Sequence, residues 1–279
     1  MNIIIKVSSV LIIAIIIIAL SLPKLLNLAG LHPKYDGEMN DLNGKKALII
    51  ATNHGILNKA GETSGKATGV FLSELSVPYY DFIKSYIDVE IGSINGGNIP
   101  IEPIPYFIET PEDKKFKKDK YAMDKIKNSI PIKKIDFTQY DIIYLAGGWG
   151  AAYDLGFSNL LGEKISEAYY NSEAIIGGVC HGVLGFINAK DKDGNLLIAG
   201  RKMTGVTDKQ VYELGIDFTP QHPETELRKA GVIFKSNTAF RDIFADLTVV
   251  DDEKRFVTGQ NQNAGHETAY KIMQLVENL

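Results

Sequence analysis

The stretch 175–183, Ile-Ile-Gly-Gly-Val-Cys-His-Gly-Val, constrains the fold of this chain more than any other. It reads as an apolar strand, a glycine turn, one cysteine and the start of a helix. This order is typical of a nucleophile elbow, a strained strand-to-helix turn that presents one side chain at the edge of a parallel sheet. The glycines leave room for the backbone of such a turn. The stretch therefore predicts an α/β fold with Cys180 at the edge of its sheet.

Cys180 is the only cysteine among the 279 residues, so it cannot form a disulfide within the chain. At the start of a helix, the helix dipole would lower the pKa of the thiol and favour the nucleophilic thiolate. The alternative is a structural cysteine, because free cysteine is among the most buried residue types. The local pattern favours the nucleophile and leaves both interpretations open.

Apolar runs alternate with helical patterns along residues 45–279. Besides the elbow strand, strands are predicted at 46–52, 88–94, 140–146, 202–205, 232–234, 247–250 and 256–259, and helices at 70–77, 112–128, 160–170, 183–189, 209–214, 223–229 and 265–279. Such alternation is that of βαβ units, and it predicts a doubly wound, mostly parallel sheet. Ligands bind such sheets at the carboxyl ends of the strands, where we expect the loops after His54, Gly147 and Cys180 to converge.

The run 3–22 consists almost entirely of Ile, Leu, Val and Ala. At about 1.5 Å per residue, a helix of this run can cross the roughly 30 Å hydrocarbon core of a bilayer. The alternative is a cleaved secretory signal peptide, with residues 19–21 as a weak cleavage site. Because of the length, we expect residues 1–22 to form an uncleaved transmembrane signal anchor. Residues 23–44 would then be a juxtamembrane connector and residues 45–279 one folded domain.

The flanking charges set the orientation of this segment poorly, because Lys6 on one side faces Lys24 and Lys34 on the other. We expect a single-pass membrane protein with its domain outside the cytoplasm, or a secreted domain if the segment is cleaved. The formal net charge of −4 gives no basic field, so we expect no nucleic-acid partner.

Three neighbours in the predicted sheet could complete a site around Cys180. His181 follows it directly, but adjacent residues at a helix start do not face each other, so this imidazole is not an evident base for the thiol. Its backbone N–H, with that of Gly148, would point to a developing oxyanion, although the pair Gly147-Gly148 could equally be a plain turn. Glu74 lies on an apolar helix. It faces either solvent or a dry pocket, where its pKa would rise and it could carry a proton.

These pieces together resemble the ThiJ/PfpI superfamily of class I glutamine amidotransferase-like proteins, in the branch of glyoxalase III and the heat-shock chaperones. The matching motifs lie in the family's order at 52–54, 65–69, 74, 78–80, 146–148, 179–182, 203–208 and 257–261. The resemblance implies a flavodoxin-like fold, here preceded by the transmembrane helix. It also implies an enzyme that needs neither a metal nor an organic cofactor.

The resemblance implies a role for each site residue. Cys180 would be the nucleophile, Glu74 the buried carboxyl that moves protons, and His181 the histidine needed for turnover. Gly147, Gly148 and the neighbouring Trp149 would form the oxyanion and binding wall. The implied reaction is that of a lyase of the D-lactate dehydratase type. It converts methylglyoxal or a similar small 2-oxoaldehyde to a 2-hydroxy acid through a hemithioacetal of the cysteine, without glutathione.

Two other functions stay open for this fold. One is a non-enzymatic chaperone or an oxidative-stress sensor in which the cysteine is oxidised reversibly. The other is a cysteine peptidase or amidase, which shares the elbow and needs a base for the thiol. We expect a small aldehyde and the membrane as partners, and a homodimer stays open.

The chain departs from the family pattern at three places. Trp149 stands where relatives usually carry histidine, and Asn261 is followed by glutamine instead of proline. The acid that often orients the histidine is replaced at about Val211, with Asp208 and Glu213 as the nearest substitutes. We therefore expect turnover to depend on whether an acid reaches His181. His54 is interpreted as a loop histidine, because no second metal ligand lies at a useful spacing.

Overall fold

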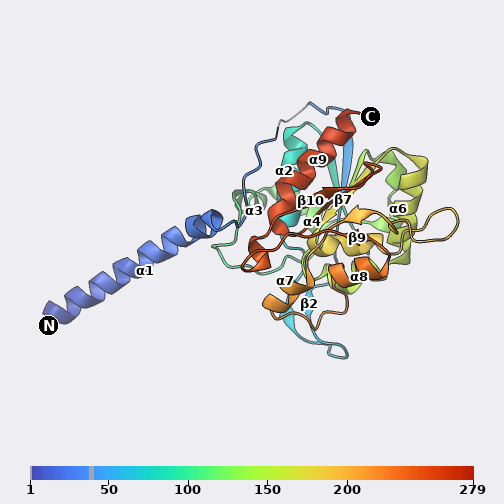
Figure 1. Cartoon of the computed structure of the whole chain (residues 1–279). Helices are drawn as coiled ribbons and strands as arrows, with labels where there is room; N and C mark the ends of the chain where they lie inside the picture. The colour runs from blue at the N-terminus through green and yellow to red at the C-terminus, as the bar shows by residue number, and fades with distance from the viewer. Residues whose placement is uncertain (1, 38–40) are drawn as a thin grey trace.

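A seven-stranded sheet forms the centre of the computed structural model, which describes residues 2–37 and 41–279 (Figure 1). The strand order is β10-β11-β7-β6-β1-β4-β5. The bounds are β1 (Lys46–Ala51), β4 (Asp88–Ser93), β5 (Ile130–Pro131), β6 (Ile142–Leu145), β7 (Ile175–Val179), β10 (Thr248–Val250) and β11 (Phe256–Gly259). All neighbours pair in parallel except β10 with β11. The predicted α/β fold with a mostly parallel sheet is confirmed.

The helices are α1 (Asn2–Leu28), α2 (Ser73–Lys84), α3 (Pro111–Phe116), α4 (Lys120–Lys127), α5 (Ala151–Asp154), α6 (Asn159–Asn171), α7 (Asp208–Glu213), α8 (Pro223–Lys229) and α9 (Gly265–Glu277). Short 3₁₀ helices are η1 (Ile132–Lys134), η2 (Phe137–Gln139), η3 (Leu155–Phe157), η4 (Cys180–Phe186), η5 (Asp242–Phe244) and η6 (Gln262–Ala264). The helical patterns predicted near α3 and α4, α6, α7, α8 and α9 are confirmed.

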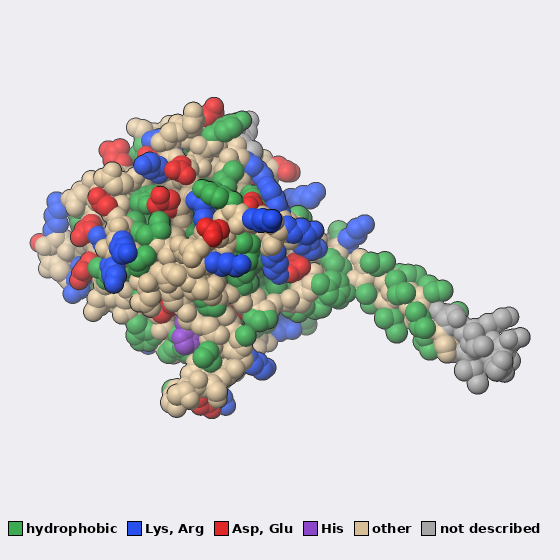
Figure 2. Space-filling model, turned by 180° about the vertical axis from the view of Figure 1, so that it is seen from behind, with side chains coloured by type: hydrophobic (Ala, Val, Ile, Leu, Met, Phe, Trp, Pro, Cys, Tyr) green, Lys and Arg blue, Asp and Glu red, His purple; other side chains and the backbone are tan. Residues whose placement is uncertain are grey.

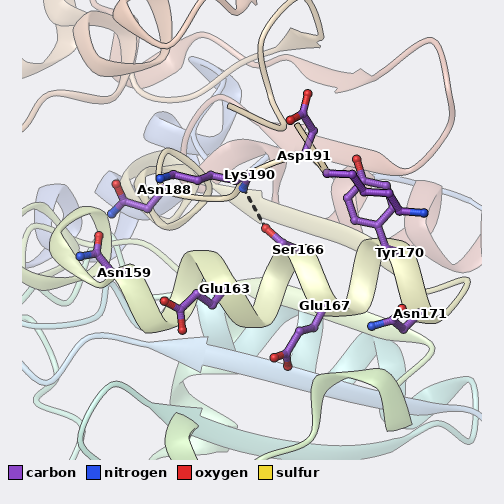
Figure 3. Close-up of a pocket in the computed structure, with 10 residues that line it drawn as sticks. Asn159, Glu163, Ser166, Glu167, Tyr170, Asn171, Asn188, Lys190 and Asp191 are labelled. Carbon is purple, nitrogen blue, oxygen red and sulfur yellow. Dashed lines mark hydrogen bonds between the residues drawn. The ribbon is translucent and has the colours of Figure 1, made fainter. Parts of the chain in front are cut away.

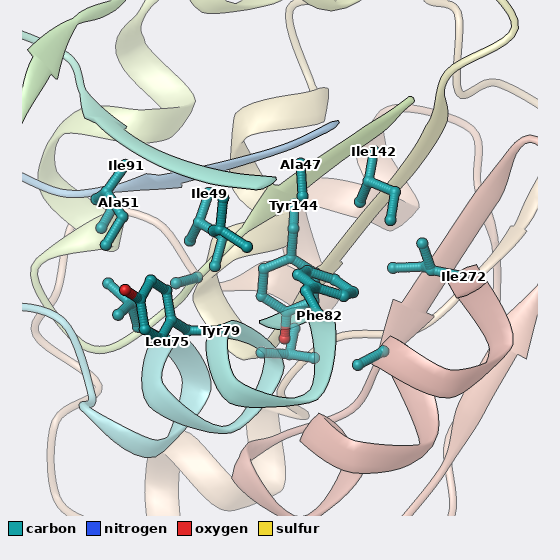
Figure 4. Packing of buried hydrophobic residues seen from close by; sticks show 14 of the residues in the cluster. Ala47, Ile49, Ala51, Leu75, Tyr79, Phe82, Ile91, Ile142, Tyr144 and Ile272 are labelled. Carbon is teal, nitrogen blue, oxygen red and sulfur yellow. The ribbon is translucent and has the colours of Figure 1, made fainter. Parts of the chain in front are cut away.

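Helices cover both faces of the sheet. On one face, α2 and α9 lie side by side and enclose Phe82, Tyr144 and Ile272 in a common apolar cluster (Figure 4). On the other face, α6 places Leu161 and Ile165 in a second cluster. Because β6 and β7 are buried on both sides, every one of their residues is apolar or glycine. This arrangement leaves the carboxyl ends of the strands as the place where loops can form a site.

The helix predicted at 70–77 is shifted, because α2 begins at Ser73 and continues through Pro78 to Lys84. A proline inside a helix removes one backbone hydrogen bond, and the sequence pattern suggests a helix end there. Residues 73–82 are all buried, however, so tertiary packing stabilises the helix across the proline. The helix predicted at 183–189 is also wrong, because a 3₁₀ helix, η4, begins at Cys180 itself.

Two small sheets lie outside the main one. The predicted strands at 202–205 and 232–234 become β8 (Lys202–Met203) and β9 (Ile233–Phe234), which pair with each other instead of with the main sheet. A hairpin of β2 (Ile56–Leu57) and β3 (Lys66–Ala67) stands in the segment that the sequence suggests is a loop. These strands are too short to show a periodic pattern.

The N-terminal helix α1 projects from the domain (Figures 1 and 2). Its stretch Val10–Leu28 is long and apolar enough to cross a membrane, and a signal sequence would have the same properties. The helix runs six residues past the predicted boundary at residue 22, with Pro23 inside it. The predicted connector therefore begins as helix, and its residues 38–40 lie outside the described part of the chain.

Candidate active site

Cys180 occupies a strained turn between β7 and η4. Its backbone has a φ of 56°, in the left-handed region that costs a residue with a Cβ atom of order 1–3 kcal/mol. At this turn the backbone of Gly182 also lies very close to that of Leu145. A Cβ atom on Gly182 would be only 2.3 Å from the carbonyl oxygen of Leu145. The side chain of Cys180 is 7% exposed. The geometry is that of a nucleophile elbow with its thiol in a narrow, enclosed position.

Glu74 lies beside this thiol, on the first turn of α2 and with 1% exposure. Its carboxyl group interacts with the thiol of Cys180 and with the backbone N–H of Gly147. A Cβ atom on Gly147 would come within 2.5 Å of Oε2 of Glu74, so only glycine fits there. Burial raises the pKa of Glu74 well above its usual value. Of the two orientations left open by the sequence, Glu74 has the one that faces a dry pocket.

The pKa of the Cys180 thiol is also raised, first by burial and then by the charge of Glu74. The backbone N–H groups of His181 and Gly148 face the sulfur and oppose this shift, but they do not reverse it. The expectation that a helix dipole lowers the pKa of Cys180 is therefore wrong. The short 3₁₀ helix η4 has only a small dipole. The cost of removing a thiolate from water is larger than the stabilisation that this dipole can give. The resting pair of Cys180 and Glu74 favours its protonated forms.

His181 does face the thiol, contrary to the expectation for adjacent residues. Its Nδ1 lies 3.4 Å from Sγ of Cys180. The rule that neighbours diverge holds for helical backbone, and the left-handed φ of Cys180 breaks it. Burial lowers the pKa of His181 to about 3, with a smaller contribution from His222. The imidazole is therefore neutral at physiological pH and can accept a proton.

Trp149 packs against the other side of this imidazole. The ring centroids of Trp149 and His181 are 4.7 Å apart, with the planes at 61°. Glu102, from the proline-rich loop after β4, accepts a hydrogen bond from the backbone N–H of Trp149 at 3.2 Å. Burial raises the pKa of Glu102 to about 7. The sequence gives no signal for Glu102, because it lies in a segment without periodicity.

The carboxyl groups of Asp208 and Glu213 are engaged away from His181. Asp208 accepts a hydrogen bond from the hydroxyl of Thr225 at 2.7 Å, and Glu213 accepts one from the backbone N–H of Asp242 at 2.8 Å. Within residues 2–37 and 41–279, Nε2 of His181 has no hydrogen-bond partner. The structure therefore does not bring either candidate acid to the imidazole.

His222 is a second residue that the sequence did not reveal. It stands at the N-terminal cap of α8, and its Nε2 is buried without a hydrogen-bond partner among the described residues. The electrostatic effect of His222 contributes to the lowered pKa of His181. The loop histidine His54 stacks on Tyr153 at 4.1 Å and contacts the carbonyl oxygen of Ile56. Across the described ranges, no three His, Cys, Asp or Glu side chains are grouped as a metal site.

Two cavities lie away from Cys180. One of about 660 Å³ lies between α6 and the segment 188–192, where Ser166 accepts a hydrogen bond from the backbone of Lys190 (Figure 3). Another of about 640 Å³ lies at the base of α1 and includes His32 and Phe107. Neither is lined by Cys180, Glu74 or His181.

Comparison with known proteins supports a common origin for this arrangement. No family model matches the chain. Glyoxalase 3 of Candida albicans is 28% identical over 246 residues, which are 83% of this chain and 98% of the relative. The X-ray structure of Rapid Encystment Protein 24 KDa (REP24) from Francisella tularensis is 30% identical, with a TM-score of 0.75 over 83% of this chain and 99% of that one. A ThiJ/PfpI domain protein from Brachyspira murdochii, 12% identical, shares the fold, with a TM-score of 0.55 over 85% of this chain and 99% of that one.

The chain belongs to the ThiJ/PfpI superfamily. The curated glyoxalase relatives place it in the glyoxalase III branch, as the sequence motifs suggest. In this member of the superfamily, the imidazole beside Cys180 packs against a tryptophan ring. Asp208 and Glu213 lie nearest in sequence to Val211, where relatives often have an acid, and both carboxyl groups form hydrogen bonds away from His181.

Proposed function

We propose that this chain is a glutathione-independent glyoxalase that converts methylglyoxal, or a similar small 2-oxoaldehyde, to the 2-hydroxy acid. The single observation that carries the proposal is the surroundings of the Cys180 sulfur. The carboxyl group of Glu74 lies next to it, and Nδ1 of His181 is 3.4 Å away. The arrangement offers a nucleophile and two groups that can hold protons, as this chemistry needs. The curated relatives carry the same activity in their names.

In the first step, the sulfur of Cys180 bonds to the aldehyde carbon. The thiol proton passes to the carboxylate form of Glu74, which contacts the thiol and whose basicity burial increases, and it later neutralises the aldehyde oxygen. Nδ1 of His181, 3.4 Å from the sulfur, stays neutral because burial lowers the pKa of this residue to about 3. The aldehyde oxygen gains negative charge. The backbone N–H groups of His181 and Gly148 already face the sulfur and are suited to stabilise that charge. The product of the step is a hemithioacetal.

In the second step, a proton leaves the former aldehyde carbon and another is added to the neighbouring carbon. Glu74 is suited to carry it, because its carboxyl group lies beside the sulfur and burial raises its pKa well above the usual value. The first carbon is thereby oxidised to a thioester and the second reduced to an alcohol, so no external oxidant is needed. Water then cleaves the thioester, which releases the 2-hydroxy acid and restores the thiol.

The test is lactate production from methylglyoxal by the purified full chain in detergent, without glutathione. We expect turnover by the wild type and none above background by Cys180→Ala. Equal rates for the two proteins would refute the proposal. Hydrolysis of peptide or amide substrates that depends on Cys180, without lactate production, would instead support a peptidase or amidase.

An oxidative-stress sensor fits this site less well. Oxidation of cysteine follows the amount of thiolate and its exposure. Burial raises the pKa of Cys180, and its side chain is 7% exposed, so both factors oppose fast oxidation. A chaperone activity would use other surfaces of the same fold, and the measurement above separates it from catalysis.

We also propose that α1 is a membrane anchor. None of its candidate span is buried against the domain, and the hydroxyl of Tyr106 donates to the carbonyl oxygen of Ala19 at 2.9 Å. An aromatic side chain with a polar tip is typical of the membrane interface, which supports a boundary near Ala19. Retention in the membrane fraction after alkaline extraction would support the anchor. A shortened form in the medium would show that it is a cleaved signal.

The side of the membrane on which the domain lies stays a prediction. The sequence leads us to expect the domain outside the cytoplasm. One observation argues for the opposite orientation: Lys and Arg side chains gather on the domain beside the base of α1 (Figure 2). Cytoplasmic flanks of membrane helices are enriched in these residues. Protection of the domain from protease in sealed cells decides between the two orientations.

A further inference from the structure

We propose that Glu102 is a positioning residue of the active site, which in its carboxylate form holds the Trp149 ring against His181 and so takes over the task of the missing acid. The catalytic part of this inference rests on the proposed function. Its structural part concerns only Glu102 and Trp149 and can be measured without any substrate.

The backbone fixes the position of the Glu102 carboxyl group. Ile101 forms a parallel bridge with Val70, and the N–H of Glu102 donates to the carbonyl oxygen of Val70 at 2.9 Å. The same segment is bonded to the turn that carries Trp149, since the N–H of Gly150 donates to the carbonyl oxygen of Gly69 at 3.2 Å. Glu102 and Trp149 are therefore held side by side by the backbones of two loops.

The carboxyl group of Glu102 interacts with both the backbone and the side chain of Trp149. Its Oε2 accepts the backbone N–H at 3.2 Å, and the side chain of Trp149 is a further hydrogen-bond partner. An indole N–H can only donate, so it prefers a charged acceptor. A carboxylate at Glu102 thus fixes the rotamer of the tryptophan ring.

Trp149 in turn is the group that orients His181. The ring centroids are 4.7 Å apart, and Nδ1 of His181 contacts the sulfur of Cys180 at 3.4 Å, so the imidazole helps to place the thiol. Nε2 of this imidazole has no hydrogen-bond partner within the described ranges. Ring packing therefore replaces the usual hydrogen bond to an acid. A looser Trp149 would let the imidazole turn away from Cys180.

The titratable groups around Glu102 determine the pH at which Trp149 is no longer held against His181. Glu74 on α2 is coupled to it by charge, His181 on η4 contacts Trp149, and His222 on α8 lies beyond His181. Burial raises the pKa of Glu102 to about 7, whereas the pKa of His181 falls to about 3. A change at Trp149 near pH 7 is therefore expected from Glu102, and variants test this assignment.

Tryptophan fluorescence is the direct test, because Trp149 is the only tryptophan in the sequence. We expect the emission of the full chain to titrate with a midpoint near the pKa of Glu102, about 7. The titration should vanish in Glu102→Gln and persist in Glu163→Gln, an exposed glutamate on α6 that serves as the matched control. A titration that persists in Glu102→Gln, or that is lost in His222→Gln instead, would overturn the proposal.

A milder variant covers the case in which Glu102→Gln does not fold. Glu102→Asp keeps the charge but withdraws the carboxylate from the backbone N–H of Trp149, so the fluorescence midpoint should move to higher pH. An unchanged midpoint would contradict the proposed hydrogen bonds. In the lactate assay, Glu102→Gln should lower kcat about tenfold with little change in KM, and the limb of the pH profile near 7 should disappear. If the wild type makes no lactate but its fluorescence titrates as expected, the proposed function fails and the positioning of Trp149 by Glu102 stands.

Discussion

Nδ1 of His181 lies 3.4 Å from Sγ of Cys180, although the two residues are neighbours in the sequence. The left-handed φ of Cys180 makes this contact possible, because it turns both side chains toward the same side of the chain. The imidazole is buried and its pKa is lowered to about 3, so it meets the thiol as a neutral acceptor. The elbow thus places a thiol and a neutral imidazole side by side from two consecutive residues.

Replacement of His181 by glutamine should therefore remove the ring that contacts the thiol and holds it in place. We expect kcat for lactate formation to fall by about 10², the scale of the loss when a reacting group is misplaced. The control is His54→Gln, since His54 stacks on Tyr153 in a distant loop and should be replaceable without loss of rate. Equal loss in both variants would point to general damage to the fold.

Glu74→Gln should separate activity from stability. Burial raises the pKa of Glu74, so folding must remove charge from a group that is ionised in the unfolded chain at neutral pH. A neutral amide avoids this cost, and we expect Glu74→Gln to raise the melting temperature at pH 7.5. The same change removes the proton carrier and should lower kcat by about 10² or more. A variant that is less stable and fully active would contradict both arguments.

Gly147→Ala tests how tightly the site is packed. The added Cβ atom would lie 2.5 Å from Oε2 of Glu74 and 2.8 Å from the backbone nitrogen of His181, so the carboxyl group must move. Overpacking of this kind costs about 1–3 kcal/mol in the free energy of unfolding. We expect activity to fall with it. Gly265→Ala is the control for the change of glycine to alanine, because its added Cβ atom would meet no atom closer than 3.5 Å. Urea unfolding and the lactate assay measure the two effects.

The sequence predicted the parts of the site that depend on local patterns. The elbow at 175–183 and the buried strands follow from glycine spacing and continuous apolar runs. The sequence could not show that Pro78 would be carried through a helix, because the burial of the whole of α2 decides this. It also could not place Glu102 and His222 near the site, since their positions result from loop packing. The pKa of Cys180 was missed for the same reason, because burial depends on the complete fold.

The pH dependence of stability gives a final prediction. Burial raises the pKa of Glu102 from 4.5 to about 7 on folding. Because of this raised pKa, the folded state still holds a proton on Glu102 at pH values at which the unfolded state has released it. The contribution of Glu102 to the free energy of unfolding is therefore fully present below pH 4.5 and is lost as the pH rises through 7. We expect the free energy of unfolding, measured with urea, to fall between pH 5 and pH 8. Glu102→Gln should make this fall shallower, whereas Glu163→Gln should leave it unchanged. A slope that Glu102→Gln does not alter would mean that Glu102 titrates normally in the folded protein, and the carboxylate at Trp149 would then persist at every pH at which the enzyme is active.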